Sequence, residues 1–466
     1  MKKTLIVLIT ILTSINTFSQ EITGPWHGAL EIPGMQLRIS FNITKTENGY
    51  SATMDSPDQN SKGMPMSAAT FENSVLKVVL ASHKIEYTGT LKKNNTISGI
   101  FKQGPNSLPL NLSRNEIEKK AAVRPQEPKT PYPYYSEEVT FVNEKENIQF
   151  SGTLTLPKKE GRFPVAILIS GSGPQNRNEE LAGHKPFLVL SDYLTKNGIA
   201  VLRYDDRGSH GSKGDFKTAT TLDFASDVKA AVAYLQTRKE INKKKIGLIG
   251  HSEGGIIAPM VAANSKEINY IVLLAGTGIP GDELLLLQEE LISRNAGSPE
   301  ESIAQDLKIS KGAYEIIKQA AATESLKSDL ANYYKTALQV ITVSDKPESM
   351  STEEYTQLLV EGISTPWMQY FIKYNPSLIL PKVKCPVLVL NGEKDIQVPA
   401  KVNLAAIKSA LEKGGNKKVT TIEFPKLNHL FQECKTCSIQ EYTEIEQTIS
   451  PLVLEEMSKW IAAQVK

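Results

Sequence analysis

The stretch KKKIGLIGHSEGGIIAP, residues 243–259, passes from lysines through an apolar run to a serine set among glycines. The apolar run predicts a buried strand, and the small and apolar residues after the serine predict a helix packed close to it. Between the two, GHSEG matches G-x-S-x-G, a sharp strand-to-helix turn that presents a serine hydroxyl at the carboxyl edge of a sheet. Gly250 and Gly254 are expected there because side chains would collide with the neighbouring strand and helix. This context, more than the motif alone, predicts that Ser252 is a nucleophile.

Strand-like and helix-like segments alternate around this turn. From residue 163 onward the strand-like runs are apolar almost throughout, as expected for a parallel sheet covered by helices on both faces. Residues 137–466 are therefore predicted to form an α/β domain. The runs expected as strands are VTFVN (139–143), IQFSGTLTL (148–156), PVAILIS (164–170), AVLRYD (200–205), IGLIG (246–250), YIVLLAG (270–276), PVLVLNG (386–392) and VTTIEF (419–424).

One long segment interrupts this alternation. Residues from about 281 to 378 carry helical patterns such as GDELLLLQEELISR and contain no clear strand. A segment of roughly a hundred residues is too long for a simple connection. It is predicted to be a helical cap inserted into the strand order of the sheet.

A serine hydroxyl needs an adjacent base, and the histidines restrict the choice. Of the six histidines in the chain only His429 follows Ser252, in the loop EFPKLNHLF after the last predicted strand. In this architecture the order along the chain is serine, acid, histidine, so the acid lies between them. The segment CPVLVLNGEKDIQVP offers Glu393 and Asp395; Asp395 is preferred because it falls deeper in the loop, and Glu393 stays open as the alternative.

An oxyanion forms when serine attacks a carbonyl group, and two preorganised N–H donors are expected to bind it. One is the backbone amide of Glu253, directly after the nucleophile. The other is expected in the loop GSGPQNRN after the strand at 164–170; Pro174 has no amide hydrogen, so the donor lies within 171–173, with Ser172 preferred. This glycine-rich loop lacks the lysine-serine ending of a phosphate-binding P-loop.

Other polar residues near these motifs are given supporting roles. His251 precedes the serine and is expected to point into the fold. In the segment RYDDRGSHGSKGDF, Asp206 and Arg207 are expected to brace loops by ion pairing, and His210 is expected to lie on the surface.

With these residues assigned, the region 137–466 resembles the α/β-hydrolase superfamily, and in particular the exported bacterial esterases and serine-aminopeptidase-like hydrolases. The motifs SGSGPQNRN, YDDRGSHGS, GHSEGG, GEKDIQVP and LNHLF carry the resemblance. It implies a cap that shapes the substrate pocket. It also implies a nucleophile, an acid, a base and an oxyanion hole at Ser252, Asp395, His429, and Ser172 with Glu253. The frequent His-Gly of the family is Ser170-Gly171 here, which leaves the second oxyanion donor open.

The first part of the chain has a different sequence pattern. Residues 20–115 contain short alternating runs such as LRISFNI separated by turn residues, which predict a small antiparallel barrel or sandwich. Trp26 and Tyr87 could line a ligand face there, although core packing is favoured. Residues 116–136 include four prolines and predict an extended linker between two domains.

The N-terminus and the cysteines bear on location. Residues 1–19, with two lysines before a short apolar run, predict a signal peptide and a secreted or periplasmic protein. The apolar run is shorter than a membrane span requires. Cys434 and Cys437 form either a local disulfide or two free thiols, and a zinc site would need two further ligands that the neighbouring sequence does not offer.

The combined prediction is an exported serine hydrolase that cleaves carboxylic esters of small-molecule substrates through an acyl-enzyme, without metal or organic cofactor. A net charge of +2 with interspersed signs argues against a nucleic-acid partner. A serine aminopeptidase or acyltransferase is the alternative; the peptidase would need an acid in the cap, such as Asp282, Glu289 or Glu290, to bind a substrate amine. A protein that binds glycans or the cell envelope through its first domain, with a vestigial hydrolase domain, is the alternative from another class.

Overall fold

The structure, a computed structural model, describes residues 21–32, 35–59, 61–104, 106–118, 123–320, 323–340 and 351–466. The predicted signal peptide at 1–19 lies outside the described residues, as do residues 119–122 of the predicted linker and residues 321–322 and 341–350 of the predicted cap. The chain divides into two compact units, Met1–Ala121 and Ala122–Lys466.

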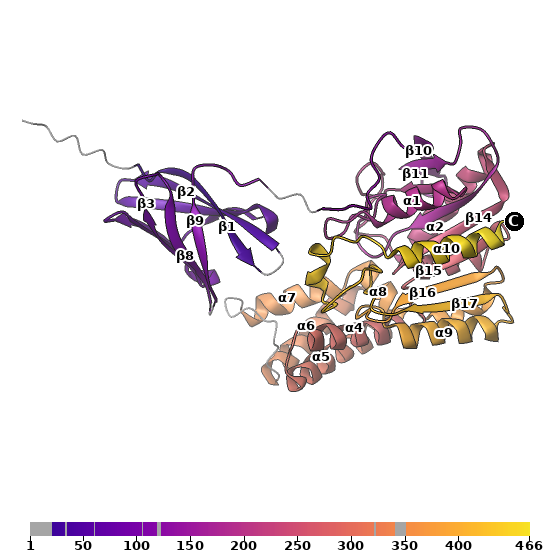
Figure 1. Ribbon diagram of the computed structural model, residues 1–466. Helices are drawn as coiled ribbons and strands as arrows, with labels where there is room; N and C mark the ends of the chain where they lie inside the picture. Colours follow the sequence, from indigo (N-terminus) through magenta and orange to yellow (C-terminus); the bar gives the residue numbers. More distant parts are fainter. Residues whose placement is uncertain are drawn as a thin grey trace, which may run out of the picture. The chain divides into compact units, whose positions relative to one another are not determined.

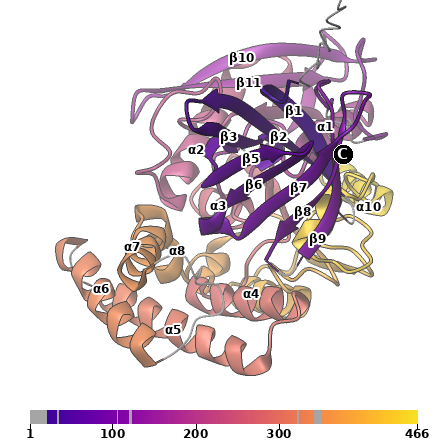
Figure 2. The ribbon, with the colours of Figure 1, turned by 90° about the vertical axis from the view of Figure 1, so that its left-hand side faces the viewer.

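The first unit is an antiparallel sheet that curls into a barrel (Figure 2). Its strands run in the order β1-β2-β3-β5-β6-β7-β8-β9, with β4 paired to β3. Two hydrogen bonds of 2.8 Å between the backbones of His27 and Ser113 join the first strand to the residue after the last. Alternate side chains fill the interior, and Trp26 and Tyr87 are fully buried in it, so both are core residues. The strand bounds are β1 (Gly24–Ile32), β2 (Met35–Thr46), β3 (Gly49–Ser56), β4 (Ser61–Pro65), β5 (Ala68–Glu72), β6 (Val75–Leu80), β7 (Ile85–Leu91), β8 (Ile97–Gln103) and β9 (Asn106–Leu112).

The second unit contains a mixed sheet in the order β10-β11-β13-β12-β14-β15-β16-β17 (Figure 1). The β10-β11 and β11-β13 pairs are antiparallel and all later pairs are parallel. Each of the eight runs expected as strands is a strand, which confirms the α/β reading. Their bounds are β10 (Tyr135–Asn143), β11 (Ile148–Leu156), β12 (Phe163–Ile169), β13 (Ala200–Tyr204), β14 (Ile241–His251), β15 (Ile268–Leu274), β16 (Val387–Gly392) and β17 (Val419–Phe424).

Helices cover both faces of this sheet, which explains why its central strands are apolar throughout. One face packs against α1 (Pro186–Lys196) and α10 (Pro451–Gln464). The other packs against α2 (Thr221–Thr237), α3 (Gly254–Ala262) and α9 (Ala400–Lys413). The two resulting hydrophobic cores lie on opposite sides of the same strands. This layering leaves the carboxyl ends of the parallel strands as the edge from which functional loops emerge.

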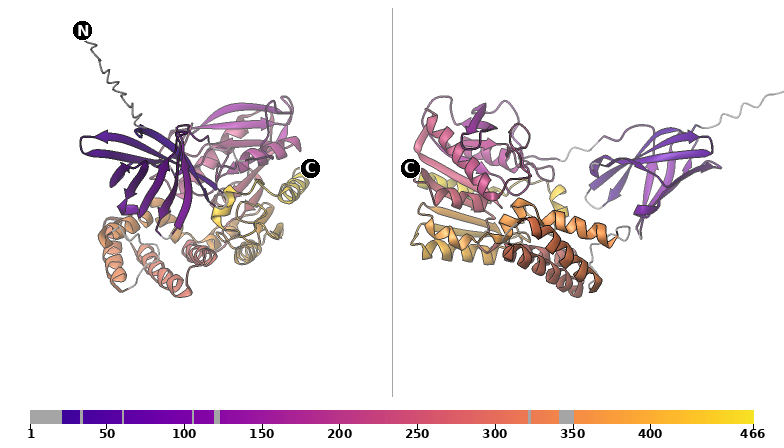
Figure 3. Two further views of the ribbon diagram at one scale, coloured as in Figure 1. Left: turned by 60° about the vertical axis from the view of Figure 1, so that its left-hand side comes forward. Right: turned by 180° about the vertical axis from the view of Figure 1, so that it is seen from behind.

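The cap lies between β15 and β16, which are neighbours in the sheet, and is helical as expected (Figure 3). Its helices pack on one another around a small core that includes Ile317, Leu330 and Ile372. The last helix also joins the main core through Phe371, so the cap is anchored to the sheet domain. The cap helices are α4 (Gly281–Asn295), α5 (Glu300–Gln319), α6 (Thr323–Val340), α7 (Thr352–Ile363) and α8 (Pro366–Lys373).

The second half of the predicted linker is bound to the second unit. The guanidinium of Arg124 donates hydrogen bonds to the backbone oxygens of Ala182, Gly183, Thr443 and Ile445. The side chain of Gln126 donates to the backbone oxygen of Ile449 and accepts from the backbone amides of Thr448 and Ile449. Proline-rich sequence predicts extended backbone but not such anchoring, because the partners lie more than fifty residues away. No helix in the described part of the chain is long and apolar enough to cross a membrane.

Candidate active site

The turn at Ser252 has the geometry that its sequence predicts. Strand β14 ends at His251, helix α3 begins at Gly254, and Ser252 between them has a φ of 52°. This left-handed conformation is costly for a serine, and strain of this kind is characteristic of functional turns. A Cβ at Gly250 would lie 2.0 Å from the backbone oxygen of Gly254, and a Cβ at Gly254 would lie 2.2 Å from the backbone oxygen of Ile169. Both positions therefore require glycine, because any side chain would collide with the backbone of a neighbouring element, as the sequence predicts.

His429 and Asp395 meet at the same edge of the sheet. His429 follows β17, and its Nδ1 lies 2.7 Å from Oδ2 of Asp395. The other carboxylate oxygen of Asp395 accepts the backbone N–H groups of Gln397 and Val398, each at 2.8 Å. Asp395 and His429 are only 3% and 5% exposed. Because the ionised carboxylate is an acceptor, Nδ1 carries the hydrogen and Nε2 of His429 is left to accept a proton.

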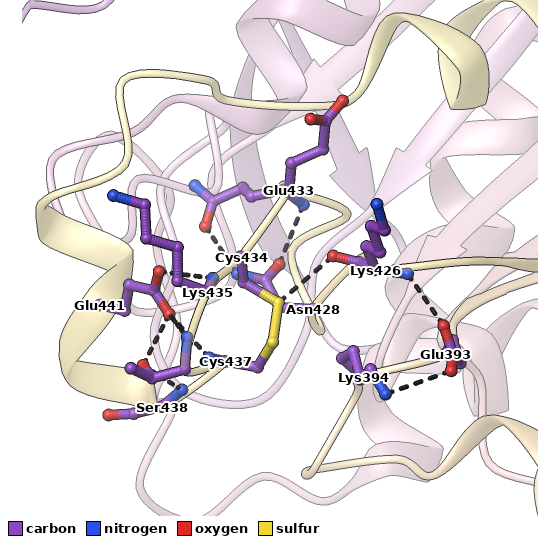
Figure 4. Close-up of a disulfide and its surroundings, with 12 residues drawn as sticks. Glu393, Lys394, Lys426, Asn428, Glu433, Cys434, Lys435, Cys437, Ser438 and Glu441 are labelled. Atoms are coloured by element: carbon purple, nitrogen blue, oxygen red, sulfur yellow. Dashed lines mark hydrogen bonds and ion pairs between the residues drawn. A yellow bond between two sulfur atoms is a disulfide. The ribbon is translucent and has the colours of Figure 1, made fainter.

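The alternative acid, Glu393, has a different environment. It is exposed, pairs with the Lys394 ammonium at 3.2 Å and accepts the backbone N–H of Lys426 at 3.1 Å (Figure 4). The Lys426 amide and then the Lys394 side chain lower the pKa of Glu393. The structure therefore brings Asp395, and not Glu393, to the imidazole of His429.

The loop after β12 lies directly against the serine. A Cβ at Gly171 would be 3.2 Å from the Cβ of Ser252. The backbone N–H of Gly171 already donates to Oε1 of Glu179 at 2.7 Å, so it is committed elsewhere. Two amides remain within 171–173, those of Ser172 and Gly173. The Ser172 amide is favoured because Ser172 borders the same cavity as Ser252.

A cavity of about 370 Å³ connects these groups with the cap. Ser252 and His429 both line it, together with Ser172 and Glu253. The cap closes it with apolar side chains and one amide, from α4 and α8: Leu284, Leu285, Gln288, Trp367, Met368 and Phe371. The wall opposite the serine is thus largely apolar.

His251 is buried, as expected, but it also lines this cavity. Its ring centroid is 4.8 Å from that of His429, and its Nε2 lies 3.1 Å from the backbone oxygen of His429. Its Nδ1 lies 2.9 Å from Oε1 of Glu179. Burial lowers the pKa of His251, but the Glu179 carboxylate outweighs it and the net pKa is raised. Sequence reasoning missed this pair because Glu179 is 72 residues away on an irregular loop.

The expectation of ion pairing is right for Arg207 and wrong for Asp206. Arg207 binds Asp227 through two hydrogen bonds of 2.7 Å and also pairs with Glu146. Within the described residues Asp206 makes no ion pair; it accepts the Ser170 hydroxyl at 2.8 Å and the Gln175 backbone N–H at 2.9 Å.

Loss of hydration, helped by the nearby carboxyls of Glu253 and Glu179, raises the pKa of Asp206 to about 8, against the opposing effect of the hydrogen bonds from Gln175 and Ser170. His210, expected at the surface, is exposed and contacts the Ser209 hydroxyl.

The loop that follows His429 is closed by a disulfide between Cys434 and Cys437, which decides between the two readings of these cysteines (Figure 4). The carboxylate of Glu441 accepts three successive backbone N–H groups of this loop, those of residues 435–437. Across the described residues, no three or more histidine, cysteine or acidic side chains are grouped so as to hold a metal ion.

Comparison with known proteins agrees with this architecture. The family model described as "Serine aminopeptidase, S33" matches residues 186–433. Esterase EstD of Thermotoga maritima is 26% identical over 313 residues, covering 66% of this chain and 65% of EstD. An acyl transferase of Photorhabdus luminescens is 32% identical over 126 residues, 27% of this chain and 37% of that protein. The chain thus spans somewhat less than two thirds of the first relative and much less of the second. The esterase Pf2001 of Pyrococcus furiosus superimposes with a TM-score of 0.42 and 16% identity, over 71% of this chain and 93% of that structure.

Proposed function

The chain belongs to the serine aminopeptidase S33 family, and from that premise we propose that it is a serine hydrolase that cleaves carboxylic esters with a Ser252–His429–Asp395 triad. The observation that carries the proposal is the shared cavity of Ser252 and His429, with Nδ1 of His429 held by Asp395. The Asp395 hydrogen bond holds the ring through Nδ1 and leaves Nε2 for the proton of Ser252. The similarity to esterase EstD supports the choice of ester bonds.

The reaction follows from these positions. Nε2 of His429 takes the proton of the Ser252 hydroxyl as its oxygen bonds to the ester carbonyl carbon, and the imidazolium is stabilised by Asp395. The negative charge that develops on the carbonyl oxygen is bound by the backbone N–H groups of Glu253 and Ser172. His429 then gives its proton to the departing alkoxide, which leaves as the alcohol.

Water completes the cycle. His429 removes a proton from a water molecule that attacks the acyl carbon, and the resulting tetrahedral intermediate collapses when His429 returns the proton to Oγ of Ser252. The products, a carboxylic acid and an alcohol, together contain the atoms of the ester and of one water molecule. No residue other than the triad and the two amides is needed for a covalent step.

The cavity supports a neutral substrate with an apolar group. Its cap-side wall is largely apolar, and within the described lining no lysine or arginine is present to bind an anionic group. The cap acids that could bind a substrate amine, Asp282, Glu289 and Glu290, are not among the described residues that line the cavity, and Asp282 and Glu290 pair with Lys318 and Arg294. The two acids that do line it are engaged by other side chains: Glu179 by His251, and Glu253 by Thr221 and Trp367. We therefore favour esters over N-terminal aminoacyl substrates.

The experiment that tests the proposal is replacement of Ser252. Ser252→Ala should abolish hydrolysis of short p-nitrophenyl esters and labelling by a fluorophosphonate probe, while the circular dichroism spectrum stays the same. A panel of acyl esters, acetylated sugars and aminoacyl amides would then rank the substrate classes side by side. Ester hydrolysis that survives Ser252→Ala would refute Ser252 as the nucleophile. A folded parent protein that neither hydrolyses any ester of the panel nor is labelled by the probe would refute the hydrolase proposal and favour a binding protein.

We further propose that the protein acts outside the cytoplasm. The leader-like composition of residues 1–19 supports this, and so does the disulfide between Cys434 and Cys437, because disulfides persist in oxidising compartments. Mass spectrometry of the protein from fractionated cells should find a mature N-terminus near Gln20 in the exported fraction. An uncleaved chain recovered from the cytoplasm would contradict this proposal.

A further inference from the structure

Glu253 has a side chain whose contacts extend well beyond the nucleophile turn. The residue is 3% exposed, and its Oε1 accepts the Thr221 hydroxyl at 2.6 Å and the indole N–H of Trp367 at 2.8 Å. Burial raises the pKa of this carboxyl group, and the nearby Ser172 side chain, like Thr221 and Trp367, acts in the opposite direction. One buried carboxyl therefore joins three separate parts of the fold: helix α2, cap helix α8 and the loop after β12.

Trp367 is the cap residue that is hydrogen-bonded to Glu253. It lies in the first turn of α8, and its ring stacks on that of Phe371 with centroids 5.3 Å apart. Both rings line the cavity that contains Ser252. The orientation of the Trp367 indole therefore sets the position of part of the apolar wall that faces the serine.

The third residue near the Glu253 carboxyl is Ser172, the proposed second donor of the oxyanion hole. Its loop has no regular secondary structure, so the position of its backbone N–H depends on side-chain contacts. Glu179 holds the preceding residue, Gly171, at its amide, and Asp206 holds Ser170 at its hydroxyl. The Glu253 carboxyl lies near the side chain of Ser172, so each of three successive residues of this loop has a buried or half-buried acid beside it.

We propose that Glu253 is a positioning residue whose side chain holds the cap wall and the oxyanion loop in register with Ser252. The proposal rests on the ester hydrolase function given above. The backbone of Glu253 supplies one oxyanion donor, and its carboxyl group holds Ser172, which supplies the other. An apolar side chain would leave the indole N–H and the Thr221 hydroxyl without an acceptor, which is why a carboxyl is retained in a buried position.

The cap half of this proposal predicts a change in chain-length selectivity. Trp367→Phe keeps an aromatic ring but removes the N–H that Glu253 accepts. Substrates with a long acyl group depend on the cap wall more than acetate does. We expect kcat/KM for p-nitrophenyl octanoate to fall about tenfold, mainly through KM, and that for the acetate ester to fall by less than about threefold.

The loop half predicts a different signature. Ser172→Ala keeps the backbone N–H but removes its anchor to Glu253, so kcat should fall for acetate and octanoate esters alike, by about tenfold. Glu253→Ala should combine both effects, whereas Glu253→Gln, which retains an acceptor oxygen, should restore most of both. A merely structural role would lower all substrates in parallel with the melting temperature and would not separate the two signatures.

A matched control keeps the outcomes distinct. Trp460→Phe also removes an indole hydrogen bond, the one to Thr420, but lies on α10 away from the cavity, so it should leave the octanoate-to-acetate ratio unchanged. An unchanged ratio in Trp367→Phe, or a Glu253→Gln variant as impaired as Glu253→Ala, would overturn the positioning role. Ester hydrolysis that persists in Ser252→Ala would instead overturn the proposed function itself.

Discussion

At the scale of single residues, Asp395 and Glu393 are two acids close in sequence that differ in their contacts. Asp395 is hydrogen-bonded to the imidazole of His429, whereas Glu393 is exposed. Asp395→Asn would place an amide beside Nδ1 of His429 and favour the wrong tautomer of the ring. We expect kcat for a p-nitrophenyl ester to fall about 10³–10⁴-fold with little change in stability. Steady-state kinetics on the purified variant measures this directly.

Glu393→Gln is the matched control, because it alters an exposed acid two positions away whose partners are Lys394 and the Lys426 amide. Its kcat should stay within about twofold of the parent. If Glu393→Gln were the more damaging change, the acid of the triad would be reassigned.

Asp206 makes a prediction about pH and stability. Its pKa is raised to about 8 in the folded protein, whereas in the unfolded chain it titrates near 3.8. Between these values the folded state holds a proton that the unfolded state has released, so the free energy of unfolding falls as pH rises. Asp206→Asn removes this proton while its side chain can still accept from Gln175 and donate to Ser170.

The free energy of unfolding of the parent should therefore drop, relative to Asp206→Asn, by about 1 kcal/mol for each pH unit between pH 5 and pH 8. Urea denaturation of both proteins at pH 5, 6, 7 and 8 tests this slope. Two parallel pH profiles would show that Asp206 is ionised in the folded state across this range.

At the scale of elements, the turn from β14 to α3 depends on the absence of two side chains. A methyl group at residue 250 would meet the backbone of α3, which cannot move without displacing Ser252. We expect Gly250→Ala to destabilise the protein by about 3 kcal/mol or more and to abolish ester hydrolysis. Urea denaturation and fluorophosphonate labelling report the two effects.

Gly362→Ala, in exposed helix α7, makes the same chemical change where nothing lies within 4 Å of the added carbon. It should stabilise the protein by up to about 1 kcal/mol, since alanine is the better helix former. A similar loss of stability in both variants would mean that the close backbone contact at residue 250 is not the reason why this position requires glycine.

Elements whose residues share one local pattern could be predicted from sequence. The apolar runs such as 270–276 are strands, the break at 281 begins a helical cap, and the glycines around Ser252 match the close contacts of the turn. The contacts of His251 with Glu179 and of Glu253 with Trp367 could not be predicted. Their partners are 72 and 114 residues away, and only the packing of cap and loops brings them together.

Asp206 shows a related limit of sequence reasoning. An acid next to an arginine in sequence suggests an ion pair, but in the loop after β13 the two side chains contact different partners, Ser170 and Asp227. Outside regular secondary structure, no backbone period fixes the directions of neighbouring side chains. Local charge patterns therefore indicate that polar groups are present without indicating which of them pair.

At the scale of the whole molecule, the residues assigned to catalysis all belong to one of the two compact units. Among the residues that the structure describes, the core of the barrel is built from residues 22–112 and the cavity is lined by residues between 171 and 429. Arg124 and Gln126 belong by their contacts to the hydrolase unit. The functional boundary therefore lies before Arg124, inside the proline-rich segment.

This boundary predicts opposite outcomes for two truncations. Residues 123–466 alone should fold and hydrolyse p-nitrophenyl acetate within about twofold of the full chain, because they keep every cavity residue and the Arg124 contacts. Residues 128–466 lose the hydrogen bonds of Arg124 to Gly183, Thr443 and Ile445, and their melting temperature should fall by about 5 °C. Differential scanning calorimetry and esterase kinetics on the two fragments measure both effects. Equal melting temperatures would show that the Arg124 contacts do not stabilise the unit, and loss of activity in 123–466 would show that the barrel contributes to the site.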